Sequence, residues 1–508
     1  MTKGSVVLIA MYDADSFAVR TLHAVLARNG FPVHSIFFKQ LNVNNTMDRE
    51  TESELQSLIG LLRRLSPILV GLSVRSTYFQ LAARLSARIK HEIGCTVLWG
   101  GVHATISPEE CLDHADAICL GEGEETLVEL AGRVSDNASW EGIANLWFKR
   151  EGEVVRHGLR PLIHDLDSLP FPDFLGVDKY LVDKDQCQPM PDQAGRYSYW
   201  IMTSRGCPFS CTYCSNNVLR RVYKGCGSYV RRRSVENVLE ELALARTNFP
   251  NLSFVCFEDD VFTFDLAWIR RFQARYKKEI DRPFFCYCHP ETVTDEMIDL
   301  LRASGATAMT MGIQSGSERT RRDLFHRFGT NEEIVRAAHV LSRHGIACSY
   351  DIIMDNPLED EQDRSQTLDL LLALPRPFEL HTTTLTHFPQ TDLTCLLLER
   401  GLIRREDVED IAQKSYERWS PSLDPRRDRE NLFWDNLFYL ASKRRVPKRL
   451  IRSLSRSHLL RRHPAPLTAL LRLTSNYIQT AGYGSKFDLW RIRLVNKVWE
   501  GIARLRRG

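Results

Sequence analysis

Residues 203–215 read Thr203-Ser-Arg-Gly-Cys-Pro-Phe-Ser-Cys-Thr-Tyr-Cys-Ser215. This stretch places Cys207, Cys211 and Cys214 at C-x3-C-x2-C spacing, within eight residues. Three thiolates this close together, in a loop that also holds a glycine and a proline, can wrap a soft metal centre. A four-iron cluster usually takes four cysteine ligands, so three local ones leave one iron open to a small chelating molecule.

The alternatives to a cluster are a zinc site or three structural cysteines. Zinc sites usually combine two close ligands with a second close pair elsewhere in the sequence. The best candidate for a second pair is Cys286 and Cys288, which are separated by one residue in a strand-like run. That spacing is shorter than the usual zinc-finger pair. The sequence therefore favours an iron–sulfur cluster held by the three cysteines of residues 203–215 and by none of the other ten.

This stretch resembles the signature of the radical S-adenosylmethionine (SAM) superfamily. In that family the amino acid end of SAM occupies the fourth iron of a [4Fe-4S] cluster. Tyr213, just before the third cysteine, fits the family's aromatic position, which is expected to lie against the adenine.

Bulk properties limit the class of protein. The chain has 508 residues, which predicts several domains, and 43% of them are hydrophobic, as in a globular protein with a large core. The sequence holds no run of 18 apolar residues, so we expect no transmembrane helix, and residues 1–10 lack a cleavable signal pattern. Thirteen mostly dispersed cysteines favour a reducing compartment, the cytoplasm, over a disulfide framework.

Residues 1–140 alternate between apolar runs typical of strands and segments with helical spacing. This βαβ order predicts an α/β domain with a Rossmann-like, doubly wound parallel sheet, whose ligands bind at the carboxyl ends of strands. The first strand is not followed by Gly-x-Gly-x-x-Gly, which argues against a dinucleotide site. The expected strands are 6–9, 33–38, 68–73, 96–99 and 117–120, and the expected helices are 16–28 and 53–65.

Three loops after those strands carry glycines, which let a backbone approach a large ligand closely. Together they resemble the cobalamin (B12)-binding domain that precedes the barrel in many radical SAM enzymes. The sequence of these loops lacks Asp-x-His-x-x-Gly, so we expect no histidine as lower axial ligand of cobalt. The alternative is a degenerate domain that binds nothing. The candidate cobalamin-binding residues are Ser73, Val74, Arg75, Ser76, Gly100, Gly101, His103, Gly121, Glu122 and Gly123.

Residues 141–195 look like a linker, with a small hairpin at 146–156 and an extended, Pro-rich stretch at 165–173. A second series of strands and helices follows. It predicts a partial (β/α)6 TIM-type barrel over 196–395, with its chemistry at the carboxyl ends of strands. The expected strands are 199–203, 253–257, 284–288, 308–313, 347–354 and 380–387.

Two strand ends in this barrel fit SAM recognition. Glu258-Asp259-Asp260 follows the second strand, and carboxylates can pair with the ammonium of SAM or bridge its ribose hydroxyls. Gly312-Ile-Gln-Ser-Gly-Ser-Glu318 ends the fourth strand and resembles the family's ribose-contacting Gly-x-Glu-Ser-Gly segment, with Gln314 in place of Glu. Solvated loop residues are the alternative for each. The resemblance assigns Tyr213, Glu258, Asp259, Asp260, Gln314 and Ser315 to SAM, and the sequence identifies no catalytic residue.

Residues 396–508 predict a basic helical C-terminal extension. Residues 442–508 hold 17 Lys and Arg and two acids, a net charge of +15, which leaves −12 for the rest of the chain. Such polarity often marks a partner surface. Amphipathic turns with Trp490 and Trp499 predict either peripheral contact with an anionic membrane or a helical cap on the barrel with a solvated basic face.

The resemblance covers about residues 1–395 and implies a cobalamin-dependent radical SAM enzyme. Its leading interpretation is a methyltransferase that acts, through a 5′-deoxyadenosyl radical, on an unactivated carbon of a small-molecule or lipid-like substrate. The alternatives are a cyclase or rearrangement enzyme resembling the anaerobic porphyrin ring cyclase, a methylthiotransferase, and a non-catalytic iron–sulfur protein. The expected partners include an electron donor such as flavodoxin or ferredoxin, and no nucleic acid.

Overall fold

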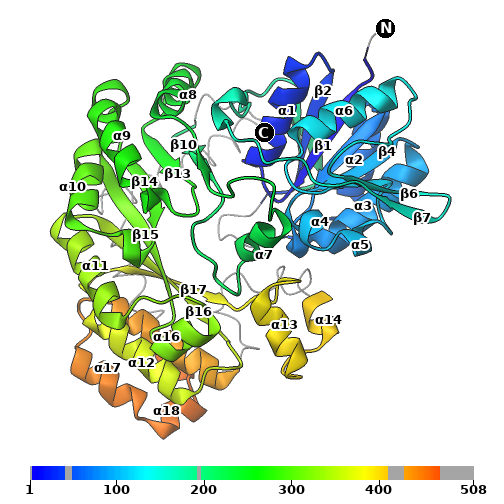
Figure 1. Ribbon diagram of the computed structural model, residues 1–508. Coiled ribbons are helices and arrows are strands. Elements are labelled where there is room, and N and C mark those ends of the chain that lie inside the picture. The colour runs from blue at the N-terminus through cyan, green and yellow to red at the C-terminus, as the bar shows by residue number, and fades with distance from the viewer. Residues whose placement is uncertain (1–2, 41–47, 191–195, 410–427, 469–508) are drawn as a thin grey trace, which may run out of the picture. The chain divides into compact units, whose positions relative to one another are not determined.

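The computed structural model describes residues 3–40, 48–190, 196–409 and 428–468. The chain divides into two compact units, coloured along the sequence in Figure 1. Unit 1 comprises residues 1–197, 204–252 and 386–419, and unit 2 comprises 198–203, 253–385 and 420–508. The chain therefore passes between the units several times, and the cysteine-rich stretch belongs to unit 1.

Unit 1 is built on a nine-stranded sheet of order β7-β6-β5-β4-β3-β1-β2-β8-β9. The ladder from β5 through β4, β3, β1 and β2 to β8 is parallel, and antiparallel strands extend both of its edges. The predicted doubly wound parallel sheet is confirmed. Its strands are β1 Val6–Met11, β2 Val33–Phe38, β3 Leu69–Ser73, β4 Thr96–Gly100, β5 Ala117–Cys119, β6 Leu146–Arg150, β7 Glu153–Arg156, β8 Lys179–Asp183 and β9 Gln186–Pro189.

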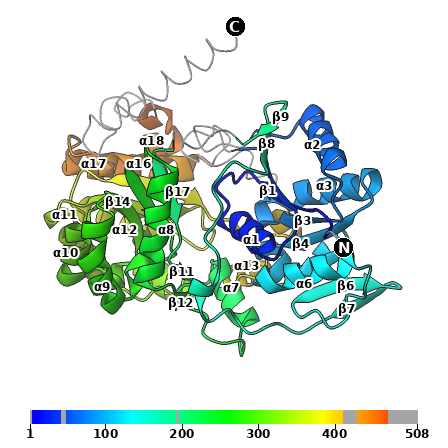
Figure 2. The ribbon, with the colours of Figure 1, turned by 90° about the horizontal axis from the view of Figure 1, so that it is seen from above.

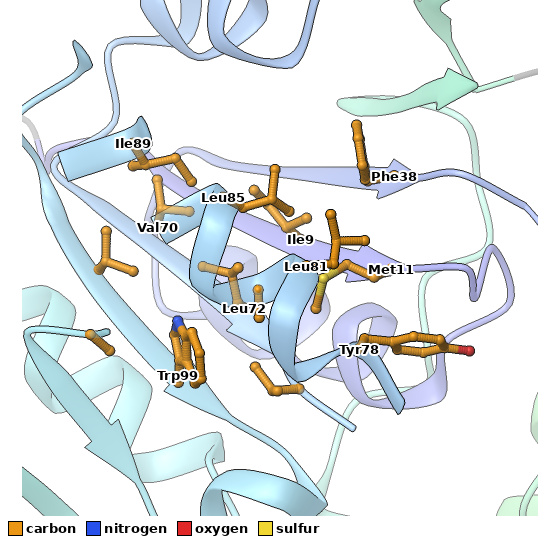
Figure 3. Packing of buried hydrophobic residues seen from close by; sticks show 14 of the residues in the cluster. Ile9, Met11, Phe38, Val70, Leu72, Tyr78, Leu81, Leu85, Ile89 and Trp99 are labelled. Atoms are coloured by element: carbon orange, nitrogen blue, oxygen red, sulfur yellow. The ribbon is translucent and has the colours of Figure 1, made fainter. Parts of the chain in front are cut away.

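Strand β1 is buried on both sides, because helices cover both faces of this sheet. Ile9 and Met11 pack in one cluster with Leu81 and Leu85 of α3, as Figure 3 shows. Val6, Leu8 and Ala10 of β1 form a second cluster with residues of α1 and α6, on the opposite side of the sheet (Figure 2). The helices of unit 1 are α1 Phe17–Arg28, α2 Glu52–Leu65, α3 Phe79–Glu92, α4 Val102–Ile106, α5 Pro108–Cys111, α6 Glu124–Ser135, α7 Ser215–Val222, α8 Val235–Asn248, α13 Asp392–Glu399 and α14 Arg405–Glu409.

The stretch predicted as a linker, residues 141–195, contributes four strands to the same sheet. The expected hairpin is present as β6 and β7. The strands β8 and β9 were not expected from the sequence; β8 pairs in parallel with β2 and turns back into β9. The domain boundaries at residues 140, 195 and 395 remain predictions.

Unit 2 is built on a parallel sheet of order β10-β13-β14-β15-β16-β17, each strand beside the next in sequence, as in the predicted partial barrel. Phe257 and Phe284 of the sheet pack against Phe272 and Tyr276 of α9. The strands are β10 Ser198–Ile201, β13 Phe254–Phe257, β14 Phe284–Cys288, β15 Ala306–Gln314, β16 Ala347–Met354 and β17 Glu379–Thr384. The helices are α9 Leu266–Glu279, α10 Asp295–Ser304, α11 Asn331–Arg343, α12 Glu361–Ala373, α16 Arg429–Ser442, α17 Lys448–Ser455 and α18 His458–Arg462.

The described part of the basic extension packs on unit 2. Helix α16 contacts α12 and β17. Arg452 and Arg461 form ion pairs with Asp369 (3.4 Å) and Glu361 (2.5 Å) of α12. Within the described residues, none of the helices is long and apolar enough to cross a membrane. The turns predicted around Trp490 and Trp499 lie outside the described residues.

Candidate functional site

The first part of the candidate site lies at the carboxyl ends of the parallel strands in unit 1. Strand β1 lies between β3 and β2, so the chain leaves it in one direction toward β2 and then crosses to β3 on the other side. Ligands of doubly wound sheets bind beside such a switch point. The loop after β3, Ser73–Ser76, therefore lies where the sequence predicted a binding loop.

The loops after β3 and β4 are joined through their backbones. Val74 donates its N–H to the carbonyl of Gly100 (2.8 Å), and its own carbonyl accepts the N–H of His103 (3.1 Å). Gly101 has a φ of +95°, and a Cβ at this position would lie 2.8 Å from the carbonyl oxygen of Val74. Only glycine fits this close approach. The structure thus brings together four of the predicted residues, Val74, Gly100, Gly101 and His103.

Arg75 reaches a residue that the sequence analysis missed. Its Nη2 donates to Oδ2 of Asp13 at 2.9 Å, in the loop that follows β1. Burial raises the pKa of Asp13, and the charge of Arg75 only partly opposes that shift. The loop after β1 carries no glycine, so composition gave no signal. Its position after the strand at the switch point is the feature that identifies it.

His103 is directed into the protein. Its Nδ1 lies 3.0 Å from Oγ of Ser76, its Nε2 lies 3.3 Å from Oε1 of Glu110, and its ring packs against Phe79. The side chain is buried. The hydrogen bond to Ser76 makes this imidazole a link between the loops after β3 and β4, and the expectation that no histidine ligates cobalt stays a prediction.

The loop after β5 packs against the helix that follows the cysteines. Thr105 accepts the N–H of Gly121 (2.9 Å) and donates to the carbonyl of Gly101 (2.9 Å), so one hydroxyl bridges two of the predicted loops. Gly121 has a φ of +76°, and an added Cβ would overlap Oη of Tyr223 and lie 2.9 Å from its Cε1. The predicted cobalamin loop and the segment after the cysteines are thus in direct contact within unit 1.

The cysteine loop begins in a short antiparallel ribbon of β11, Ser204–Arg205, and β12, Arg231–Arg232. Gly206 follows β11 with a φ of +85°, and an added Cβ would overlap the carbonyl oxygen of Tyr229. Arg220 of α7 reaches back to the carbonyl of Phe209 (3.3 Å). The loop is therefore shaped by its backbone contacts.

The far side of the cysteine loop is fastened to α13. Asn217 donates to Oδ2 of Asp392 at 2.7 Å, and Arg221 also pairs with that carboxylate. Leu393 donates its backbone N–H to the carbonyl of Thr212 (3.1 Å), between the second and third cysteines. A segment about 175 residues further along the chain thus completes the support of the loop.

The three cysteines differ in exposure: Cys211 is buried, whereas Cys207 and Cys214 are half-buried. Among the residues that the structure describes, no three or more His, Cys, Asp or Glu side chains are grouped as metal ligands. The donor set, three thiols on one short loop, fits an iron–sulfur cluster with one open iron. The ligand assignment therefore rests on donor chemistry and spacing and stays a prediction.

The second part of the candidate site lies at strand ends in unit 2. Asp259 is fully buried, and its Oδ1 accepts the backbone N–H (3.0 Å) and the hydroxyl (2.9 Å) of Thr203. It joins the ends of β10 and β13. Burial, and then the charge of Asp259, raise the pKa of Glu258 to about 7. Asp260 is exposed.

The end of β15 is held by polar contacts to α12 and the turn before it. Ser315 is buried and donates to Oε1 of Glu359 (2.6 Å), and Gly316 donates its N–H to Thr367 (2.8 Å). Gln314 has a φ of +71°, a conformation that costs a residue with a Cβ about 1–2 kcal/mol. Arg321, which the sequence analysis missed, fixes this turn by donating to the carbonyl of Ser315 (2.6 Å).

Comparisons with known proteins identify two families along the chain. Residues 5–131 match the B12 binding domain family, and residues 201–371 match the Radical SAM superfamily. An uncharacterized methyltransferase of Pyrococcus horikoshii is 27% identical over 342 residues, which cover 66% of this chain and 70% of that protein. The cytidylyl-2-hydroxyethylphosphonate methyltransferase of Streptomyces wedmorensis is 30% identical over 281 residues, 48% of this chain and half (50%) of that protein.

A solved structure has the same fold. The radical SAM methyltransferase TsrM from Kitasatospora setae, solved with tryptophan substrate and a SAM analogue, superposes with a TM-score of 0.61 at 19% identity. The match covers 78% of this chain and 76% of that one. With a B12 binding domain at residues 5–131 and a radical SAM domain at residues 201–371 in one chain, the protein belongs to the cobalamin-binding (class B) family of radical SAM enzymes.

Proposed function

We propose that the protein is a cobalamin-dependent radical SAM methyltransferase that acts on an unactivated carbon of a small-molecule or lipid-like substrate. The observation that carries the proposal is the pair of family matches in one chain, together with two similar proteins that are methyltransferases. The cofactors of the family, a [4Fe-4S] cluster, SAM and cobalamin, supply an electron, a hydrogen-abstracting radical and a methyl group when bound.

Cys207, Cys211 and Cys214 are the proposed cluster ligands. The supports around them favour this role, because Gly206 and Arg220 constrain the backbone of the loop that carries the cysteines. Three thiolates leave one iron for the amino acid end of SAM.

We assign SAM contacts to Glu258, Asp260 and Gln314, and the adenine to Tyr213. Asp259 and Ser315 are proposed to support these strand ends of unit 2 as anchors, since each is buried and hydrogen-bonded to a neighbouring segment. Cobalamin is assigned to the loops after β3, β4 and β5.

A radical SAM enzyme needs a substrate and a reductant. We propose a flavodoxin or ferredoxin as the electron donor, and a cytoplasmic enzyme without a nucleic-acid partner. Peripheral membrane contact through residues 442–508 stays a prediction. The ion pairs of Arg452 and Arg461 with α12 favour the competing interpretation, in which this segment caps unit 2.

The test uses full-length protein purified without oxygen and reconstituted with iron, sulfide and cobalamin. It is incubated with a chemical reductant, SAM labelled in its methyl group, and an extract of small molecules and lipids. Release of 5′-deoxyadenosine together with a labelled, methylated product is the expected result. The Cys211→Ala protein is the control and yields neither. Consumption of SAM without 5′-deoxyadenosine contradicts the proposal.

One alternative has an observation of its own. The anaerobic magnesium-protoporphyrin IX monomethyl ester cyclase of Rubrivivax gelatinosus is 25% identical over 352 residues, 65% of this chain and 58% of that protein. A cyclase releases 5′-deoxyadenosine while no methyl label enters the product, so the same experiment separates the two functions.

A further inference from the structure

The ribbon that leads into the cysteine loop carries two arginines opposite each other. Arg205 and Arg231 are direct partners in the β11–β12 register. Like charges directly opposite in a ribbon are destabilising. Something else must therefore hold these two cations side by side.

Two carboxylates from the loop after β5 compensate those charges. Glu122 accepts Nη1 of Arg205 at 2.7 Å on one oxygen and Nη1 of Arg231 at 3.0 Å on the other. Glu124, the first residue of α6, accepts Nη2 of Arg205 at 2.6 Å. The guanidinium of Arg205 thus bridges two carboxylates, and the carboxylate of Glu122 bridges two guanidiniums. We call these four residues the clasp.

The clasp is largely shielded from water. The side chains are 6% exposed for Arg231, 8% for Glu124, 14% for Glu122 and 29% for Arg205. Burial alone would raise the pKa of Glu122, but the hydrogen bond from Arg231 and the charge of Arg205 outweigh it and lower that pKa. The backbone N–H of Ile163 also donates to Glu122 (2.8 Å). The two carboxylate oxygens of Glu122 thus accept three donors from other parts of unit 1.

The ends of the clasp lie next to the two predicted cofactor loops. Glu122 and Glu124 flank Gly123, where the loop after β5 leads into α6. Arg205 lies two residues before Cys207, and the residue between them, Gly206, has no room for a Cβ. The clasp and the first cysteine are therefore separated by a single, closely packed residue.

We propose that Glu122 and Glu124 are positioning residues that couple the cobalamin site to the iron–sulfur cluster. The clasp joins the loop after β5 to the ribbon that leads into the cysteine loop, so ordering of one loop favours ordering of the other. A ligand that orders one loop therefore tightens binding at the other, and by linkage the effect is reciprocal. This inference rests on the proposed function, because it requires that both cofactors bind.

The test measures the cobalamin dissociation constant of the full-length protein twice, with and without the reconstituted cluster, from the cobalamin absorption spectrum. Wild type is expected to bind cobalamin about 5–150-fold more tightly when the cluster is present. Glu124→Gln removes one charge from the clasp and leaves the pairs of Glu122, so it is expected to lower that ratio toward one. The matched control is Glu125→Gln, the next residue of α6, whose 66% exposed carboxylate pairs with Arg160 (3.1 Å) outside the clasp. It keeps the wild-type ratio.

A second readout reports on the cluster itself. Adding cobalamin is expected to change the electron paramagnetic resonance spectrum of the reduced cluster in wild type and Glu125→Gln, and to change it less in Glu124→Gln. Should Glu124→Gln fail to fold by circular dichroism, Arg205→Lys replaces it, because an ammonium cannot bridge two carboxylates in the same fork geometry.

The inference is overturned if the wild-type ratio is one, or if Glu124→Gln or its replacement Arg205→Lys keeps the wild-type ratio. A wild-type protein that binds no cobalamin, or forms no cluster, overturns the proposed function and the coupling with it. The two failures are therefore distinguishable in the wild-type measurement alone.

Discussion

Gly206→Ala tests whether the backbone before the first cysteine shapes the metal site. Gly206 has a φ of +85°, and a Cβ there would overlap the carbonyl oxygen of Tyr229 and lie 3.0 Å from its carbonyl carbon. Gly225→Ala is the matched control, because Gly225 has a φ of +90° in the same segment and nothing lies within 4 Å of an added Cβ.

The two substitutions share one cost and differ in another. Left-handed backbone costs a residue with a Cβ about 1–2 kcal/mol, which applies to both. Forcing an atom into a closely packed place adds about 1–3 kcal/mol, and this applies only to Gly206 because its neighbour is main chain and cannot rotate away. The expected loss in free energy of unfolding is therefore about 2–5 kcal/mol for Gly206→Ala and about 1–2 kcal/mol for Gly225→Ala.

Stability is measured on both variants without cofactors by urea unfolding followed by circular dichroism, and iron content is measured after reconstitution. Gly206→Ala is expected to unfold at lower urea and to hold less iron per chain, whereas Gly225→Ala holds as much as wild type. Equal destabilisation of the two variants, with full iron in both, would refute the reasoning.

The remaining predictions concern the cluster, cobalt, a carboxyl group and the tail. Replacing Cys207, Cys211 or Cys214 by Ala should remove the iron and the near-ultraviolet charge-transfer absorption; a full cluster in Cys211→Ala contradicts the assignment. The Co(II) form should show no axial nitrogen hyperfine splitting in electron paramagnetic resonance, and such splitting would restore a histidine ligand. Because the pKa of Glu258 is raised to about 7, that group's contribution to the free energy of unfolding is full below its usual pKa and is lost as pH rises through 7. The urea midpoint of unfolding should therefore fall less between pH 5 and 8 in Glu258→Gln than in wild type. An identical fall in both proteins would show that the pKa of Glu258 is not raised. Finally, if residues 442–508 contact membranes, sedimentation with anionic vesicles at low salt should be lost on their deletion; a cap on unit 2 predicts no sedimentation of either protein.

The sequence identified the strands well where burial is complete. Residues 6–9 are apolar without interruption because β1 is covered on both faces, and an unbroken apolar run of this length is typical of a buried parallel strand. Helix α1 was expected from residue 16, and Ser16 is its N-cap. By contrast, β8 and β9 were missed because they extend an edge of the sheet, where residues such as Lys179 and Gln186 interrupt the apolar pattern.

In the candidate site, too, the sequence predicted some features and missed others. Glycines at strand ends could be predicted, since Gly101 and Gly121 are required by positive φ and close approach. The clasp could not be predicted, because Glu122 and Arg205 are 83 residues apart and only the packed structure brings them together. Sequence reasoning placed Asp259 correctly after a strand, but it could not tell that the carboxylate is used to hold Thr203.

The contact between Asp392 and α7 sets an order of events during synthesis. Asn217 leaves the ribosome 175 residues before its partner Asp392. At about 5–20 residues per second this separation amounts to roughly 9–35 s. Throughout that interval the nascent chain already contains the whole cysteine loop but lacks the helix that fastens its far side. The cysteine loop therefore gains its support from α13 only after the strands of both large sheets have been synthesised.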